Sequence, residues 1–161
     1  MPTVLIPLPA LDFDPTEVAV SWSVLTRLGH EVVFATPDGR PGEADALMLT
    51  GEGLDVWGLV PGLRRLTVVG RVLGANADAR QAYAAMARDP AFLNPIRWDE
   101  AATARFDGLL LPGGHRARGM RAYLESEVLQ ALVARAFAAD MPVAAICHGV
   151  LLAARSRAAD G

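Results

Sequence analysis

The fold of this chain is decided by the stretch Met141-Pro142-Val143-Ala144-Ala145-Ile146-Cys147-His148-Gly149-Val150-Leu151-Leu152. It holds the only cysteine of the sequence, between an apolar run typical of a buried β-strand and an apolar run with helical spacing. Ala145 and Gly149 flank Cys147 with the spacing of a nucleophile elbow. In such an elbow a strand turns sharply into a helix and the central side chain stays exposed. Small flanking residues are needed because the two backbone arms come close together there.

The elbow predicts a reactive sulfur at Cys147. The sulfur would lie over the first turn of the helix, where backbone N–H groups and the helix dipole favour negative charge. A free thiol with a pKa of about 8.5 is only about 3% thiolate at neutral pH, and a pKa of about 6 would make it mostly thiolate. The alternative is a buried, inert cysteine that serves as a small hydrophobe. The elbow pattern favours the reactive interpretation.

Length and composition bound the class of protein. The 161 residues predict a single α/β domain over residues 1–161, and 52% hydrophobic with 20% charged residues is typical of a soluble globular protein. The net charge is −3, and acidic and basic residues are interspersed, so the sequence shows no basic cluster of the kind that binds nucleic acid. A single cysteine excludes an internal disulfide and fits the cytoplasm. We find neither a signal peptide nor an apolar run of about 18 residues, so no membrane partner is expected.

Alternating strand and helix patterns predict a parallel sheet with helices on both faces. Apolar runs that indicate buried strands occupy residues 3–6, 31–35, 106–111 and 142–146. Helical spacing or helix-start signals occupy residues 14–29, 78–88, 124–137 and 149–155. We expect Asp14 and Asp78 to cap the first two of these helices. Right-handed crossovers then favour a doubly wound arrangement.

Two segments do not fit this alternation. Residues 40–76 are rich in glycine and show no clean hydrophobic period, which indicates an irregular excursion. The excursion would cover the site, meet a second subunit, or simply pack on its own core. Residues 94–100 read as a connector without regular structure.

The fold brings three distant features to one edge of the sheet. In doubly wound sheets, ligands bind outside the carboxyl ends of the strands. Glu17 follows the first strand, Gly113 and Gly114 follow the third, and Cys147 follows the fourth. We therefore expect a carboxyl group, a glycine turn and a thiol to lie close together.

Each of these features also has a simpler interpretation. Glu17 has the spacing of a capping box with Asp14, and Gly113 with Gly114 could serve only a tight turn. The functional interpretation is that the glycine amides and the amide of His148 form an oxyanion hole.

The histidines are equally open to two interpretations. His148 would act as a base beside the sulfur or face solvent at the helix start. His115 would bind substrate or cap the next helix. The sequence contains three histidines without paired spacing, which give no case for a metal site.

A carboxylate beside the thiol has a definite electrostatic cost. An ionised Glu17 would raise the pKa of Cys147. The pairing helps only if burial keeps Glu17 protonated, so that it donates a hydrogen bond to the thiolate. The pair would then hold one proton, with the negative charge on the sulfur.

Ala-Ile-Cys-His-Gly, Leu-Leu-Leu-Pro-Gly-Gly-His and the helix start Asp-Pro-Thr-Glu together resemble the ThiJ/PfpI (DJ-one/PfpI) superfamily of class I glutamine amidotransferase-like proteins. The resemblance spans residues 3–155 and implies a flavodoxin-like fold, a homodimer and no cofactor. It maps the family cysteine to Cys147, the helix-start glutamate to Glu17, the oxyanion glycine to Gly114 and the post-cysteine histidine to His148. The excursion resembles the glyoxalase III/chaperone branch.

One departure from that branch concerns the end of the chain. Members of the branch continue with more sheet and helix, and some supply an acidic partner for the histidine there. This sequence ends first, so we expect a fold that lacks its C-terminal part and a chain truncated from a longer protein.

The resemblance implies an enzyme that converts small reactive carbonyls such as methylglyoxal to hydroxy acids. Cysteine-dependent amide or peptide hydrolysis is a related alternative. A holdase chaperone or stress-response protein, which would use its apolar surfaces instead of the thiol, is the alternative from another class. A redox sensor whose Cys147 is oxidised to a sulfinic acid is a third alternative.

Overall fold

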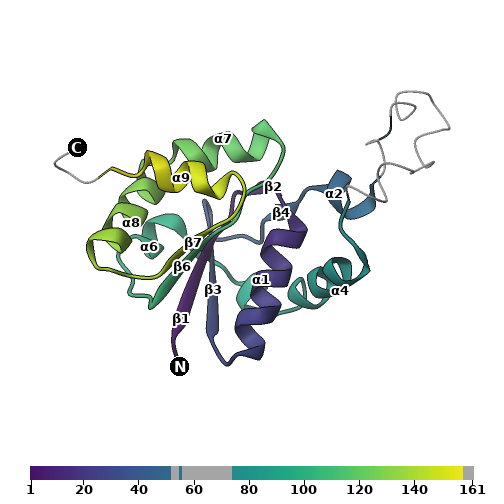
Figure 1. Cartoon of the computed structure of the whole chain (residues 1–161), viewed down its shortest axis with the longest axis horizontal. Helices are drawn as coiled ribbons and strands as arrows, with labels where there is room; N and C mark the ends of the chain where they lie inside the picture. Colours follow the sequence, from purple (N-terminus) through teal and green to yellow (C-terminus); the bar gives the residue numbers. More distant parts are fainter. Residues whose placement is uncertain (52–54, 56–73, 158–161) are drawn as a thin grey trace.

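A parallel five-stranded sheet forms the centre of the computed structural model, which describes residues 1–51, 55 and 74–157 (Figure 1). The strand order is β5-β3-β1-β6-β7. The strands are β1 (Thr3–Pro7), β3 (Glu31–Thr36), β5 (Ile96–Arg97), β6 (Gly108–Leu111) and β7 (Val143–Ala145). This arrangement confirms the predicted α/β class with a parallel sheet.

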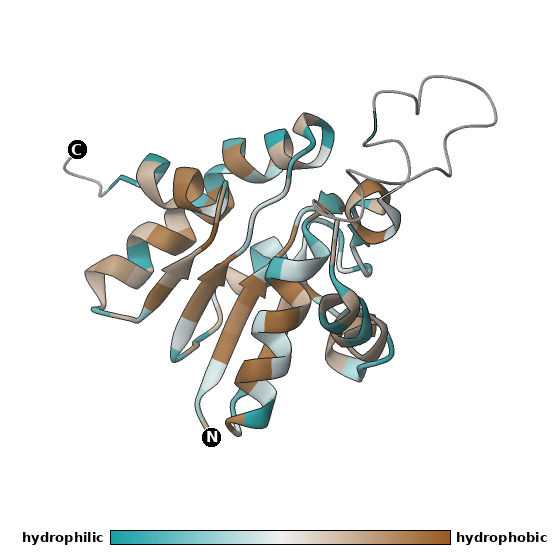
Figure 2. Ribbon diagram, turned by 45° about the vertical axis from the view of Figure 1, so that its right-hand side comes forward, coloured by the Kyte–Doolittle hydropathy of each residue, from teal (hydrophilic) through white to brown (hydrophobic). Residues whose placement is uncertain are grey.

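Helices cover both faces of the sheet, as Figure 1 shows. One face carries α1 (Pro15–Arg27), α4 (Ala77–Met86) and α5 (Pro90–Leu93). The other carries α6 (Trp98–Ala101), α8 (Glu127–Ala138) and α9 (Gly149–Arg155). Successive strand residues point to opposite faces, so Leu5 and Leu109 join one core cluster while Ile6 and Leu110 join the other. The central strands are accordingly the most hydrophobic elements (Figure 2).

The segment expected to be irregular contains short regular elements where it is described. β4 (Glu43–Ala44) pairs in parallel with β2 (Leu11–Phe13) in a small two-stranded sheet, and α2 (Ala46–Thr50) follows. Residues 52–54 and 56–73 of the predicted excursion lie outside the described residues. None of the described helices has the length and apolar character that crossing a lipid bilayer demands.

The helix predicted over residues 124–137 corresponds to α8, but it begins at Glu127, and Leu124 belongs to a separate helix before it. α7 (Ala117–Glu125) ends at Ser126, and α8 begins directly after it. Ser126 is extended, and its hydroxyl accepts a hydrogen bond from the Leu129 amide at 3.3 Å. A serine in this position starts a new helix, and the apolar spacing runs across the break without revealing it.

Two further expectations also need correction. The cap of α4 is Asn76, whose side chain accepts from the Ala79 amide at 2.8 Å, and not Asp78. The predicted connector at residues 94–100 contains the edge strand β5 and the helix α6. Trp98 orders this segment because its indole is buried and donates to the carbonyls of Leu8 and Ala35 at 3.2 and 3.3 Å.

The elbow has the geometry that its sequence predicts. Cys147 has a φ of 51°, in the left-handed region that L-residues rarely adopt. A Cβ atom on Gly149 would lie 2.0 Å from the Leu111 carbonyl oxygen. The close approach of α9 to the end of β6 therefore requires glycine at position 149.

This contact predicts the stability of two glycine variants. Gly149→Ala forces the backbone of α9 away from β6 and should lower the free energy of unfolding by about 1–3 kcal/mol, as overpacking does. Gly108→Ala is the matched control, because its Cβ would lie 3.6 Å from its nearest neighbours. Urea denaturation measures both variants. Equal stability of the two would contradict this account of the elbow.

Candidate active site

The site lies at the carboxyl ends of β1, β6 and β7, where three loops converge. β1 lies between β3 and β6, so the chain winds outward in both directions from this point. Such a switch point leaves a crevice between diverging loops. The segments that carry Glu17, Gly113 and Cys147 meet there, as the sequence predicts.

Glu17 is held by the glycine turn and not by its own helix start. Asp14 caps α1 by accepting from the amides of Thr16 and Glu17 at 2.8 and 3.1 Å. The Glu17 carboxyl does not complete a capping box. Its Oε2 instead accepts from the Gly113 amide at 2.7 Å, while the Asp14 amide donates to the Gly113 carbonyl at 3.0 Å. The capping interpretation of Glu17 is therefore wrong.

The thiol of Cys147 is exposed and electrostatically coupled to Glu17. Burial raises the pKa of Glu17, and the amide of Gly113 opposes this by donating to the carboxylate. Burial also raises the pKa of Cys147, and the negative charge of Glu17 raises it further, while the His148 amide lowers it. The thiol pKa therefore differs from the lowered value that helix position alone predicts.

Because Glu17 and Cys147 are coupled, their protonation has to be described for the two groups together. Two groups that each disfavour the other's negative charge lose their protons in two separated steps. Between these steps Glu17 and Cys147 share one proton and one negative charge. Attack on an electrophile can then proceed with transfer of that proton, without a free thiolate in the resting state.

His148 lies beside the sulfur, and His115 lies next to His148. The Nδ1 atom of His148 is 3.3 Å from Cys147 Sγ. The rings of His115 and His148 meet edge to face with centroids 6.4 Å apart, and Nδ1 of His115 is 3.5 Å from Asp14 Oδ2. His115 does not cap α7, because Arg116 takes the cap position without a side-chain bond.

The glycine turn packs directly against the elbow. A Cβ atom on Gly113 would lie 2.7 Å from the His148 nitrogen and 3.2 Å from Cys147 Cβ, so only glycine allows this approach. The Gly113 amide is engaged by Glu17 and is not free for a substrate oxyanion. No described residue accepts the Gly114 amide hydrogen. Gly114 and His148 are therefore the remaining candidates for oxyanion donors.

The sequence did not predict an ion pair that lies behind the glycine turn. Asp12 is buried with a φ of 64°, and Arg118 donates to its two carboxylate oxygens at 2.8 and 2.9 Å. A Cβ on Gly114 would lie 2.3 Å from the Asp12 carbonyl oxygen, so this pair backs the turn. No local spacing could reveal it, because the partners are 106 residues apart.

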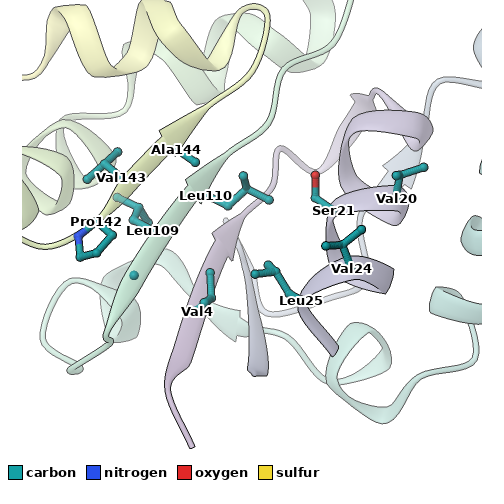
Figure 3. A pocket seen from close by; sticks show the side chains of 11 residues that line it. Val4, Val20, Ser21, Val24, Leu25, Leu109, Leu110, Pro142, Val143 and Ala144 are labelled. Atoms are coloured by element: carbon teal, nitrogen blue, oxygen red, sulfur yellow. The ribbon is translucent and has the colours of Figure 1, made fainter. Parts of the chain in front are cut away.

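Two hollows bear on the site differently. The larger, about 540 Å³, is an apolar groove between α1 and strands β1, β6 and β7 (Figure 3). It is not lined by Cys147 or Glu17. A second pocket of about 410 Å³ includes Gly114, His115 and His148 in its wall and therefore adjoins the nucleophile.

Within residues 1–51, 55 and 74–157, no group of three or more His, Cys, Asp or Glu residues could hold a metal ion.

The coupling of Glu17 to Cys147 predicts the effect of Glu17→Gln on thiol reactivity. The amide keeps an oxygen for the Gly113 amide and removes the negative charge that raises the thiol pKa. The pH profile of Cys147 alkylation by iodoacetamide should therefore shift to lower pH. Glu31→Gln, at the start of β3, is the control with the same change of charge. A profile that stays in place or moves to higher pH would refute the coupling.

The Asp12–Arg118 pair predicts a pH-dependent loss of stability. The Arg118 guanidinium lowers the pKa of Asp12, so the stabilisation is present above the unfolded pKa of about 4 and is lost as pH falls through the folded value. Arg118→Gln should lower the urea midpoint at pH 7 more than at pH 3. The control Arg121→Gln, on an exposed pair, should change it less. A pH-independent difference for Arg118→Gln would argue against the pair.

Comparison with known proteins agrees with this geometry. The model of the ThiJ/PfpI family-like proteins matches residues 8–160. Drosophila melanogaster DJ-1beta superimposes with a TM-score of 0.60 at 20% identity, over 98% of this chain and 61% of that one. A DJ-1 superfamily protein from Salmonella typhimurium gives 0.57 at 19% identity, over 97% and 59%.

Two further structures match at lower sequence identity. A ThiJ/PfpI domain protein from Brachyspira murdochii gives a TM-score of 0.59 at 13% identity, over 96% of this chain and 63% of that one. A glyoxalase III from Candida albicans gives a TM-score of only 0.47 at 16% identity, over 93% of this chain and 58% of that one. No curated protein matches.

These similarities establish the fold and the family, and not the activity. The chain spans about three fifths of the length of DJ-1beta and of the Salmonella and Brachyspira proteins. The family model covers the glycine turn, the elbow and the start of α1 together. The chain belongs to the ThiJ/PfpI-like family.

Proposed function

We propose that this protein is a cysteine-dependent enzyme that acts on small reactive carbonyls without a cofactor. The observation that carries the proposal is an exposed thiol on a left-handed turn, coupled to Glu17 and 3.3 Å from the ring of His148. A nucleophile, a proton acceptor and amide donors at one point are the parts that addition to a carbonyl requires.

The first step is addition of the thiol to an aldehyde carbon. A bond forms between Cys147 Sγ and the carbon, and the carbonyl π electrons move to the oxygen. The amides of Gly114 and His148 stabilise this oxyanion, and the shared proton of the Glu17–Cys147 pair neutralises it. The product is a hemithioacetal.

The following steps convert an α-oxoaldehyde to a hydroxy acid. Glu17 or His148 removes the proton from the carbon bound to sulfur, and the electrons form an enediol. Return of that proton to the neighbouring carbon gives a thioester. Water hydrolyses the thioester, which releases the hydroxy acid and the free thiol. The sequence of steps consumes one water and needs no external oxidant.

A holdase chaperone is the second candidate, and the apolar groove favours it. The groove is lined by valine and leucine side chains from α1 and the sheet, including Val20 and Val24, which are partly exposed (Figure 3). Exposed apolar surface of this kind binds other apolar surfaces. The predicted homodimer and cytoplasmic location remain predictions.

Replacement of Cys147 separates the two candidates. Cys147→Ala should slow methylglyoxal consumption by more than about a hundredfold, since effects of this size follow loss of a catalytic nucleophile. Loss of dicarbonyl absorbance and formation of lactate measure it. The same variant should suppress aggregation of a heated client protein as well as wild type does.

A groove variant provides the matched control. Val24→Glu places a charge in the groove and should leave methylglyoxal consumption within about twofold of wild type, because neither Glu17 nor Cys147 lines the groove and Val24 lies two helical turns beyond Glu17 on α1. Equal methylglyoxal consumption by wild type and Cys147→Ala would disprove the enzyme proposal.

A further inference from the structure

The pocket beside the nucleophile has walls from two helices. On α7, Met120, Arg121, Leu124 and Glu125 recur at the spacing of one helix face. On α9, Arg155 lies at the end of the helix whose start follows His148. Met120 is buried and gives the pocket an apolar floor, while the arginine side chains lie at its exposed walls.

The charged side chains of this pocket are mostly cationic. They are Arg116, Arg121, Arg155 and Glu125, with His115 and His148 beside them. Arg121 pairs with Glu125 through Nε, at 3.2 Å to each carboxylate oxygen. The single carboxylate in the wall is therefore already neutralised.

The other two arginines have weak partners or none. The guanidinium of Arg155 has no ion pair or hydrogen bond with any described residue. Arg116 lies 3.6 Å from Asp12 and 3.9 Å from Asp45, outside hydrogen-bond distance. Asp12 pairs with Arg118, and Asp45 accepts only from the neutral Leu47 amide, so the charge of Asp45 still compensates that of Arg116. Arg155 is therefore the arginine of this pocket whose charge no described residue compensates.

The pocket that holds this charge extends to the neighbour of the thiol. The His148 ring touches Cys147 Sγ and also forms part of the pocket wall. Arg155 follows His148 by seven residues, so their backbones are about 10 Å apart along the helix axis. The pocket that His148 and Arg155 both line is therefore open to the remaining atoms of a carbonyl compound bound at the sulfur.

We propose that this pocket binds an anionic group of the substrate, so that the natural substrate is a short aldehyde or α-oxoaldehyde with a carboxylate or phosphate a few bonds from the carbonyl. Planar guanidinium groups bind both anions through paired N–H donors. The inference rests on the proposed function and narrows its substrate class from neutral carbonyls to anionic ones.

The test compares two maleimides that share one reactive head. N-ethylmaleimide is neutral, and 3-maleimidopropionate carries a carboxylate on a short chain. We expect the ratio of the anionic to the neutral alkylation rate at Cys147 to exceed that of N-acetylcysteine at least fivefold. Arg155→Gln should lower this ratio about threefold or more, and 0.5 M NaCl should also lower it, since salt screens the attraction.

Arg105→Gln is the matched control. Arg105 is exposed and precedes the amino end of β6, whereas the site lies at the carboxyl ends of the strands. Its replacement changes the net charge by the same amount as Arg155→Gln. This variant should keep the wild-type ratio. A wild-type ratio at or below that of N-acetylcysteine, or equal ratios in wild type and Arg155→Gln, would overturn the anionic-substrate proposal while leaving the reactive thiol intact.

A measurement without thiol chemistry distinguishes the two proposals. Glycerol 3-phosphate, but not glycerol, should shift the amide resonances of α7 and α9 in Cys147→Ala, and Arg155→Gln should abolish that shift. Failure of both maleimides to modify Cys147 would contradict the proposed function, and the titration then decides the pocket independently. Absence of any shift with glycerol 3-phosphate would overturn the anionic-substrate proposal.

Discussion

One hydrogen bond, from the Gly113 amide to the Glu17 carboxyl, determines how the site is assembled. It joins the turn after β6 to the first turn of α1, and the Asp14 amide returns a bond to the Gly113 carbonyl. The carboxyl is thereby held beside Cys147, while the turn is held against the elbow. The position of the acid and the shape of the glycine turn consequently depend on each other.

The parts of the site that were predictable depend on short local patterns. The elbow around Cys147 and the double glycine are read from neighbouring residues, and the alternation of strand and helix places them at one edge. The partner of Glu17 was not predictable, because capping-box spacing is a local signal and the Gly113 amide that wins is 96 residues away. The Asp12–Arg118 pair, 106 residues apart, left no trace for the same reason.

The features of the fold that the sequence did not predict also have specific causes. The break between α7 and α8 occurs at Ser126 within a continuous apolar spacing, so hydrophobic periodicity carries no sign of it. Strand β5 is only two residues long and lies at the edge of the sheet, where little burial is required of its side chains. Hydrophobic periodicity indicates which face of an element is buried. The break at Ser126 arises from helix capping and strand β5 from strand pairing, so periodicity indicates neither.

The left-handed backbone of Cys147 has a consequence for how this sequence would vary. An L-residue there costs roughly 1–2 kcal/mol relative to a comfortable conformation, and glycine is the residue that escapes this cost. A population selected only for resistance to heat would thus drift toward glycine at position 147. Retention of cysteine in a population selected for activity as well would be a record that chemistry, and not folding, governs this position.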